Sequence, residues 1–300
     1  MSESAAIDVG PVRGQSPGHE ARARFAHNRA AMIGLVLLAL MALLALFGPL
    51  CWLHTADTLY SDRIAWAPAL KDWHVLGTDS EGRDVAARVL IGVRFSLLIL
   101  LAATFVMLAI GVVWGAIAGA VGGAIDATMM RVVDALCAIP FVLLVVLLLA
   151  VVSRSDPTQN MLLIILALGA TNWFKIARAI RDEAALLRHA SFVDAARTGG
   201  ASSAQIFFRH IAPNLSGQVI VQAVLAAPLA LTLESVLSFL GFGAQAPFAS
   251  LGQLIAAGVT ETETAPWMML SAVAALLVTL LALNLVGDGV RAASERRVGG

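Results

Sequence analysis

The chain contains six long stretches without a single Asp, Glu, Lys or Arg, and this feature limits its possible folds most. The stretches are 30–53, 95–125, 135–153, 157–174, 215–233 and 264–287. Each has the roughly 18–20 residues that a helix needs to cross a hydrocarbon core about 30 Å thick. The chain is 59% hydrophobic and only 13% charged, as is typical of polytopic membrane proteins. Because backbone amides find no water inside lipid, we predict an all-α integral membrane protein with six transmembrane helices.

The basic residues predict how these helices are oriented. If the N-terminus lies inside, 14 of the 20 Lys and Arg residues fall in cytoplasmic segments and the other 6 fall outside. Cytoplasmic loops of membrane proteins carry such an excess of Lys and Arg. We therefore expect both termini in the cytosol, together with the loop between spans four and five.

The spacing of apolar and polar segments predicts four regions. Residues 1–28 are expected to be a disordered cytosolic tail, because they are too polar to form a core. Residues 29–93 are expected to hold the first transmembrane helix and an extracytoplasmic segment. Residues 94–291 are expected to form a five-helix core, and residues 292–300 a second cytosolic tail.

Glycines suggest different roles in two apolar segments. In the second span a glycine recurs every four residues, which favours close packing of another helix over a substrate channel; these are Gly111, Gly115, Gly119 and Gly123. The segment 235–260 is also uncharged. Its glycines, Gly252 among them, are expected to break any helix, so this segment is predicted to be a loop or a re-entrant piece.

The loop 191–213 is polar and begins with a helix-start pattern. Ser191 and Asp194 have the spacing of a capping box, in which each side chain satisfies a free backbone N–H. Gly199 and Gly200 follow and can end such a helix.

A second short helix is expected after these glycines. Ser202 and Gln205 repeat the capping-box spacing, and Pro213 is expected to stop the helix. Its predicted apolar face contains Ile206, Phe207 and Ile211, with Phe207 and Phe208 as anchors. The loop therefore predicts two short helices meeting at a tight joint, a shape suited to docking.

Glu234 is the only acid within a predicted span. Counting the fifth span from residue 215 places Glu234 near the outer surface, where ionisation costs little. A helix cap or a hydrogen bond to a neighbouring helix is the favoured interpretation, and a contact with a pore, gate or substrate is the alternative.

Sequence patterns of catalysis are missing. A Walker phosphate loop needs Gly-Lys followed by Ser or Thr, and the only lysines, Lys71 and Lys175, follow Leu70 and Phe174. No catalytic residue, metal site or bound cofactor is therefore expected, and any ATP and magnesium would be bound by another chain. No basic region is large enough for nucleic acid, so the chain is not expected to bind it.

Two motifs resemble a known family. Asp194-Ala195-Ala196-x-x-x-Gly200, followed by Ile211-x-Pro213, resembles the EAA loop of bacterial ABC import permeases, with Asp for the usual Glu and Ala212 for the usual Leu. His74-Val-Leu-Gly-Thr78-Asp79-x-x-Gly82-Arg83-Asp84 resembles the H-x-L-G-T-D-x-x-G-R-D motif of the dipeptide/oligopeptide branch. The stretches 237–241 and 284–289 also resemble that branch, and the chain is most similar to its C-type subunit.

The resemblance implies a permease subunit of a heteromeric importer in the bacterial cytoplasmic membrane. Such a subunit pairs with a B-type permease and with two ATPase subunits, and an extracytoplasmic solute-binding protein delivers the peptide. ATP binding and hydrolysis on the partner subunits then drive alternating access. The residues that the resemblance places in contact with the ATPase are Ser191, Phe192, Asp194, Ala195, Ala196, Gly200, Phe207, Ile211 and Pro213.

The segment 54–94 has two open interpretations, a structural lid over the spans or a contact with the binding protein. Within it, residues 77–79 are expected to form a turn, and 84–90 a short amphipathic helix lying on the membrane surface. The candidate contact or outer-gate residues are Thr78, Asp79, Gly82, Arg83 and Asp84.

Other functions stay open at this point. The same importer class also carries nickel chelates, glutathione or other peptide-like solutes. A secondary transporter is less favoured, because the acids avoid the middle of the spans and no internal repeat is visible. An intramembrane enzyme would need convergent Ser, His or Asp groups in the spans, and the histidines lie at or beyond the span ends.

Overall fold

The structure, a computed structural model, describes residues 17–152, 156–243 and 248–294. Its α-helices are α1 (Pro17–His27), α2 (Arg29–Cys51), α3 (Val85–Val121), α4 (Gly123–Cys137), α5 (Phe141–Val152), α6 (Pro157–Thr171), α7 (Phe174–Arg188), α8 (Ser191–Thr198), α9 (Ser203–Ile206), α10 (Ala212–Asn214), α11 (Ser216–Leu237), α12 (Leu251–Thr260) and α13 (Pro266–Ser294). A 3₁₀ turn covers Lys71–Trp73, and π turns cover Phe207–Ile211 and Ser238–Phe242. Within the described ranges β pairing is limited to one bridge, between Thr78 and Asp84. The predicted all-α class is confirmed.

Four to six segments qualify as membrane spans. The helices α2, α3 and α13, and α11 together with the π turn that follows it, are each long and apolar enough to cross a membrane. The pair α4 and α5 and the pair α6 and α7 meet the same criterion jointly, with bends of 77° and 44°. Pro140 lies at the first bend, where a proline interrupts helical hydrogen bonding. The predicted third and fourth spans are therefore not straight helices.

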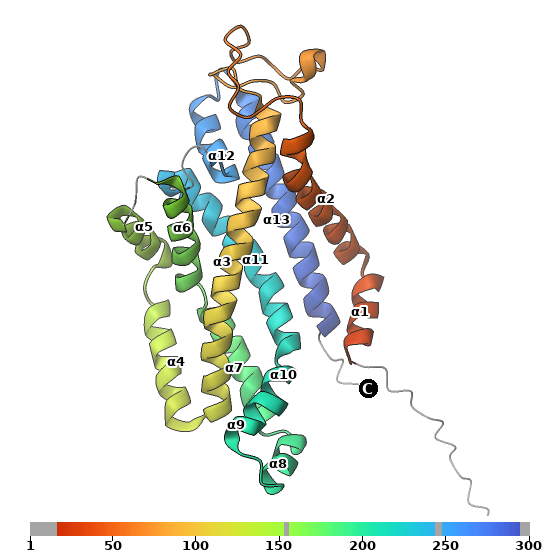
Figure 1. Ribbon diagram of the computed structural model, residues 1–300, viewed down its shortest axis with the longest axis vertical. Coiled ribbons are helices and arrows are strands. Elements are labelled where there is room, and N and C mark those ends of the chain that lie inside the picture. The colour runs from red at the N-terminus through yellow and green to blue at the C-terminus, as the bar shows by residue number, and fades with distance from the viewer. Residues whose placement is uncertain (1–16, 153–155, 244–247, 295–300) are drawn as a thin grey trace, which may run out of the picture.

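The helix α3 is the central element (Figure 1). It begins at Val85, well before the predicted start at residue 95, and its 37 residues correspond to about 55 Å. The prediction of a separate surface helix over 84–90 is wrong. Helix α3 passes through Gly92 without a break. A Cβ at Gly92 would lie only 2.9 Å from Leu254 Cδ1, so the absence of a side chain lets α12 pack against α3.

Helix α7 packs against the glycines of α3. A Cβ at Gly111 would lie 2.8 Å from Ile176 Cβ, and Cβ atoms at Gly115 and Gly119 would clash with the α7 backbone. The prediction that these glycines serve helix packing is thus confirmed. Gly123 is different, because it is the first residue of α4 and has nothing within 4 Å of a Cβ.

Ion pairs hold the charged face of α7 against α4. Arg181 Nε donates to Asp126 Oδ1 at 2.8 Å, and Arg178 Nη2 donates to Asp134 Oδ1 at 2.6 Å. These pairs let α7 keep its charged side chains while its apolar side fills the glycine stripe of α3.

The N-terminal segment is more ordered than predicted. Residues Pro17–His27 form α1, so the expected disorder of 1–28 is wrong for that part, while residues 1–16 lie outside the described residues. The Phe25 ring lies over Gly289 of α13, where a Cβ would come within 3.0 Å of it. This contact contributes apolar burial that the composition of the tail did not suggest.

The segment 235–260 differs from its prediction in the role of Gly252. It contains the helix α12, and Gly252 lies inside this helix, where a Cβ would clash with the backbone of Ser235. The glycine therefore permits close packing of α12 on α11 instead of breaking the helix. Residues 244–247 of this segment lie outside the described residues.

Candidate functional site: the knob and the cap

The candidate residues gather at the two ends of the molecule. Figure 1 shows the knob, residues 191–214, at the lower end beneath α3 and α7. The cap, residues 52–84, lies at the upper end, beyond the upper ends of α2, α3 and α13. Glu234 lies between them, on α11.

The knob begins with α8, which starts differently from the prediction. The N-cap is Ala190 and no side chain caps the first turn, so the predicted capping box of Ser191 and Asp194 is wrong. The helix starts one residue early, which makes Ser191 its first helical residue. The Asp194 carboxylate instead accepts a hydrogen bond from Arg197 Nη1 at 3.2 Å.

The glycines end α8 as predicted. Gly200 has a φ of +84°, and its N–H donates to Arg197 O at 3.1 Å. The next N–H, of Ala201, donates to Ala196 O at 3.0 Å. These two bonds form a Schellman motif, which satisfies carbonyls at the helix end. A Cβ at Gly200 would meet nothing within 4 Å, so only the backbone conformation requires glycine there.

The second capping box is confirmed. Gln205 Oε1 accepts from Ser202 N at 2.9 Å, and Ser202 Oγ accepts from Gln205 N at 3.3 Å. The helix that starts here does not stop at Pro213, and that prediction is wrong. The chain continues through the π turn Phe207–Ile211 and α10 into α11. A proline needs room for its ring and has no N–H to donate, and the wider π turn before it meets both needs.

Buried aliphatic side chains anchor the knob. Val193, Ile206 and Ile211 are 0%, 6% and 2% exposed and belong to the core that α3, α6, α7 and α11 share. Phe207 packs against this core as predicted, but Phe208 is 73% exposed and does not anchor the knob. Val193 was missed by sequence reasoning, although Val193 and Ala196 have the i, i+3 spacing of an apolar helix face.

The other predicted knob residues form its surface. Ser191, Phe192, Asp194, Ala195, Gly200 and Pro213 are exposed, and Ala196 is half-buried. A firmly anchored knob thus presents one short helix and two exposed phenylalanines, Phe192 and Phe208, to its surroundings.

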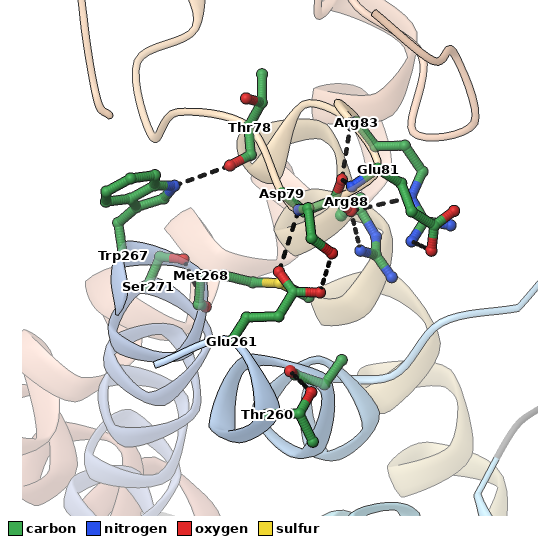
Figure 2. Close-up of polar contacts among 12 residues, drawn as sticks. Thr78, Asp79, Glu81, Arg83, Arg88, Thr260, Glu261, Trp267, Met268 and Ser271 are labelled. Atoms are coloured by element: carbon green, nitrogen blue, oxygen red, sulfur yellow. Dashed lines mark hydrogen bonds and ion pairs between the residues drawn. The ribbon is translucent and has the colours of Figure 1, made fainter. Parts of the chain in front are cut away.

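In the cap, Asp79 is the centre of a charged network (Figure 2). Its side chain has no exposed surface, and it accepts hydrogen bonds from Arg83 N at 2.8 Å and Arg83 Nε at 2.9 Å, and another from Arg88 Nη1. Burial by itself raises the pKa of Asp79, but the hydrogen bonds from Arg83 and the charges of Arg88 and Arg83 outweigh it. The pKa of Asp79 therefore lies below its ordinary value, and the carboxylate is ionised at neutral pH.

Asp84 joins the cap to the first turn of α3. Its Oδ1 accepts from Ala87 N at 2.7 Å and from Trp52 Nε1 at 3.0 Å, while its Oδ2 pairs with His74 Nδ1 at 2.8 Å. The Asp84 side chain is fully buried. It therefore works as a helix cap and as a joint between α2, α3 and the cap.

His54, His74 and Asp84 lie close enough to be considered as metal ligands, with candidate ligand atoms within 4.8 Å of one another. Their atoms already have partners, since His54 Nδ1 bonds Tyr60 Oη at 2.8 Å and His54 Nε2 bonds a backbone carbonyl at 2.9 Å. His74 Nε2 faces the Arg63 guanidinium at 3.2 Å, and a guanidinium repels a cation. This trio is therefore a hydrogen-bonded support of the cap.

The remaining predicted cap residues are also structural. Thr78 is fully buried, and its Oγ1 accepts from Trp66 N at 2.9 Å and donates to Arg63 O. Gly82 has a φ of +79°, and a Cβ there would clash with the Tyr60 backbone. Of the five predicted residues only Arg83 has an appreciably exposed side chain, at 25%.

Two links tie the cap to the turn after α12 and to the start of α13. Ser80 N donates to Glu261 Oε2 at 3.1 Å, and Ser80 Oγ donates to the other carboxylate oxygen. Trp267 Nε1 donates to Thr78 O at 3.0 Å (Figure 2). Sequence reasoning missed Glu261, because a partner 181 residues away along the chain leaves no local pattern.

Glu234 connects helices inside the molecule. It has no exposed surface, so the prediction that it lies where ionisation costs little is wrong. Its carboxylate accepts from Ser238 Oγ at 2.7 Å and from Ser96 Oγ on α3 at 3.1 Å, so the predicted hydrogen bond to a neighbouring helix is confirmed. Ser96 Oγ in turn accepts from Leu251 N at the start of α12, at 3.1 Å. Glu234 therefore fixes α3, α11 and α12 together.

Comparison with known proteins agrees with this architecture. Residues 111–300 match the family model described as binding-protein-dependent transport system inner membrane component. Residues 16–68 match the N-terminal TM domain of oligopeptide transport permease C. The fold is shared with the MetNI methionine ABC transporter in an inward-facing conformation, with a TM-score of 0.54, 21% identity and coverage of 70% of this chain and 97% of the other.

Similar sequences cover nearly the whole chain. The oligopeptide transport system permease protein OppC of Escherichia coli (strain K12) is 40% identical, over 95% of this chain and 92% of that protein. OppC of Bacillus subtilis (strain 168) is 35% identical, over 99% and 97%. The dipeptide transport system permease protein DppC of the same organism is 35% identical, over 92% and 84%. The chain belongs to the family of binding-protein-dependent transport system inner membrane components, and within it to the C-type ABC permeases of the oligopeptide branch.

Proposed function

We propose that this chain is the C-type permease subunit of an ATP-driven importer that carries di- and oligopeptides across the bacterial inner membrane by alternating access. It would pair with a B-type permease and two ATPase subunits, and a solute-binding protein would deliver the peptide. The chain itself would bind neither ATP nor magnesium and would carry no catalytic residue.

The anchoring of the knob is the observation that carries this proposal. Val193 and Ile206 fix both short helices to the core that contains α3 and α7, and the chain then runs helically into α11. A displacement of α8 would therefore reach the spans without being absorbed by a flexible loop. Such transmission is what a non-catalytic subunit needs when it is driven from a separate ATPase.

The proposed topology has six spans with both termini inside. It counts each bent pair, α4 with α5 and α6 with α7, as one span. This topology places the knob in the cytosol, where ATP-binding partners are found, and the cap outside, where a binding protein would dock. The excess of Lys and Arg in the knob-side segments supports the orientation.

The predicted residues take more specific roles in this proposal. Phe192 and Phe208 offer the exposed apolar surface for the ATPase subunit. In the cap, Thr78, Asp79, Gly82 and Asp84 would set the shape of the outer surface, and Arg83 would be available to the binding protein. Glu234 would hold α3, α11 and α12 together through its hydrogen bonds with Ser96 and Ser238, and it would not contact the transported peptide.

Purification from the membrane tests the proposal. ATPase subunits should copurify with the tagged wild-type chain and should be lost when Phe192 and Phe208 are both replaced by Ala. Leu50→Ala is the matched control, because Leu50 is 74% exposed at the cap-side end of α2. Absence of any ATPase from the wild-type preparation, or ATP hydrolysis by the chain alone, would contradict the proposal.

Uptake assays identify the cargo. A strain lacking this subunit should regain uptake of a labelled tripeptide when it receives the wild-type gene. Nickel chelates and glutathione, added in excess, should not compete with the peptide. Competition by either would shift the assignment to that solute within the same importer class.

A further inference from the structure

A cavity of about 630 Å³ lies between the knob and the lower ends of α3 and α7. Its apolar wall comes from the end of α3 and from the second half of the knob, and its polar wall comes from the end of α7 and from α8. The lining residues are Ile117, Ala120, Val121, Arg188, His189, Arg197, Ser203, Ala204 and Phe207. Only Arg197 comes from α8, so the cavity lies mainly between the ends of α3 and α7 and the second half of the knob, away from the exposed tip of α8.

The charge of this cavity is positive. Two arginines and a histidine line it, and none of its described lining residues is acidic. Arg197 shares its charge with Asp194, at 3.2 Å, but both side chains remain more than half exposed. Arg188 has a coulombic attraction to Asp126, but the Asp126 carboxylate accepts its hydrogen bonds from Arg181.

The Arg188 guanidinium is held in place by the fold. Its Nη1 donates to Val121 O, the last carbonyl of α3, at 2.9 Å. Gly122, with a φ of +71°, makes room for it, because a Cβ there would clash with the guanidinium. The Nε atom of Arg188 is shielded from solvent and is without a hydrogen-bond partner among the described residues. Its Nη2 lies 3.1 Å from His189 Nε2, so two of the lining side chains contact each other beside the cavity.

An anion with several oxygens fits these features. Guanidinium groups bind phosphate through N–H···O contacts, and each Nη of Arg188 carries a second N–H besides the one that faces Val121 O or His189 Nε2. The wall formed by Ile117, Ala120 and Phe207 suits hydrocarbon next to that anion. Basic pockets between transmembrane helices on the cytoplasmic side are typical sites for lipid head groups.

We propose that this cavity binds the phosphate group of an anionic phospholipid such as phosphatidylglycerol. The assignment to the inner leaflet rests on the proposed orientation, but the binding itself does not. Arg188 and Arg197 hold the phosphate, and the apolar wall takes the glycerol and the first acyl carbons. The bound lipid joins the ends of α3 and α7 to the knob and so stiffens the connection through which the knob moves the spans.

Native mass spectrometry of the detergent-purified full-length protein, with the subunits that copurify, tests this inference. Phosphatidylglycerol should remain bound more tightly than phosphatidylcholine. Replacing Arg188 or Arg197 with Gln should each weaken phosphatidylglycerol binding about fivefold, the effect expected for one arginine near an anionic head group. Arg197→Gln leaves the Arg188–Val121 bond in place, so a folding defect in Arg188→Gln would not decide the outcome. Arg131→Gln removes one exposed positive charge from α4 outside the cavity and should have little effect.

Four results would overturn the inference. Equal retention of both lipids would do so, as would equal weakening by Arg131→Gln. Saturable binding of inorganic phosphate that blocks phosphatidylglycerol and needs Arg188 would assign the cavity to a free anion instead. Displacement of the lipid by copurified ATPase subunits would make the cavity part of a protein interface. Because lipid binding is measured without transport, its failure alongside normal peptide uptake would count against this inference alone.

Discussion

The knob and the cap contain similar motifs of glycine and acid but are stabilised in opposite ways. In the knob, aliphatic side chains are buried, and Gly200 stands in open space while Asp194 is exposed. In the cap, the charges are buried: Asp79 and Asp84 have no exposed surface, and Gly82 is pressed against the Tyr60 backbone.

The difference explains what each region can do. A buried charged network is rigid only while every partner is present, because an unpaired charge in the interior is costly. An apolar anchor leaves the polar surface free for a partner. The cap is therefore suited to keeping one conformation, and the knob is suited to binding a partner through its exposed surface.

Gly82→Ala should produce the largest effect and tests the comparison directly. The substitution combines an unfavourable positive φ with a steric clash, so we expect a loss of about 3–4 kcal/mol in the free energy of unfolding. Gly200→Ala has the unfavourable φ without the clash and should lose about 1–2 kcal/mol. Thermal unfolding of the two purified variants measures the difference, and equal losses would refute the contrast between the glycines.

Asp79→Asn should come next, because it leaves the mostly buried Arg88 without its carboxylate. We expect a loss of about 3 kcal/mol in the free energy of opening of the cap. Amide hydrogen exchange of residues 77–84 measures this opening. Exchange that stays at the wild-type rate would show that the ion pairs contribute nothing.

The same residue predicts the pH dependence of the cap. The pKa of Asp79 in the folded protein lies below its unfolded value, which is about 3.9, so the stabilisation is complete above that pH. It is lost as the pH falls through the folded pKa, because protonation removes the charge that Arg83 and Arg88 bind. Hydrogen exchange between pH 7 and pH 3 should show this acid opening in the wild type and lose its Asp79-dependent part in Asp79→Asn.

Val193→Ala should have an intermediate effect in the knob. It removes two methyl groups from a fully buried site, which costs about 2 kcal/mol. Phe208→Ala removes a larger but 73% exposed side chain and should cost less than about 0.5 kcal/mol. If Phe208→Ala lowers the melting temperature more than Val193→Ala does, the assignment of the anchor is wrong.

Ser202→Ala should give the smallest measurable loss, about 1 kcal/mol, because it removes one side of the capping box at α9. Ser191→Ala is the control, since Ser191 caps nothing, and its effect should be close to zero. A loss with Ser191→Ala equal to that of Ser202→Ala would restore the first capping box.

Local patterns in the sequence predicted local structure well. The Ser202–Gln205 box, the helix end at Gly199 and Gly200, and the packing role of Gly111, Gly115 and Gly119 all depend on residues within a turn or two of each other. Two local predictions failed, since Ser191 and Asp194 form no capping box and Pro213 does not end its helix, and other failures involve distant partners. Gly252 was read as a helix breaker because Ser235, which lies against it, is 17 positions away, and Glu234 was placed near the surface because its partner Ser96 lies on another helix.

The sequence by itself determined that this chain lies in a membrane, because its uncharged stretches are long enough to cross one. It also determined that these stretches are helical, because a single helix satisfies all of its backbone hydrogen bonds within lipid. It also determined the family, because several motifs occur in the right order. Only the tertiary structure decided where α3 begins, where the paired spans bend, and which acids are buried. These features depend on which side chain meets which across the molecule, and the burial of Asp79, Asp84 and Glu234 is favourable only when their hydrogen-bond donors have been brought beside them.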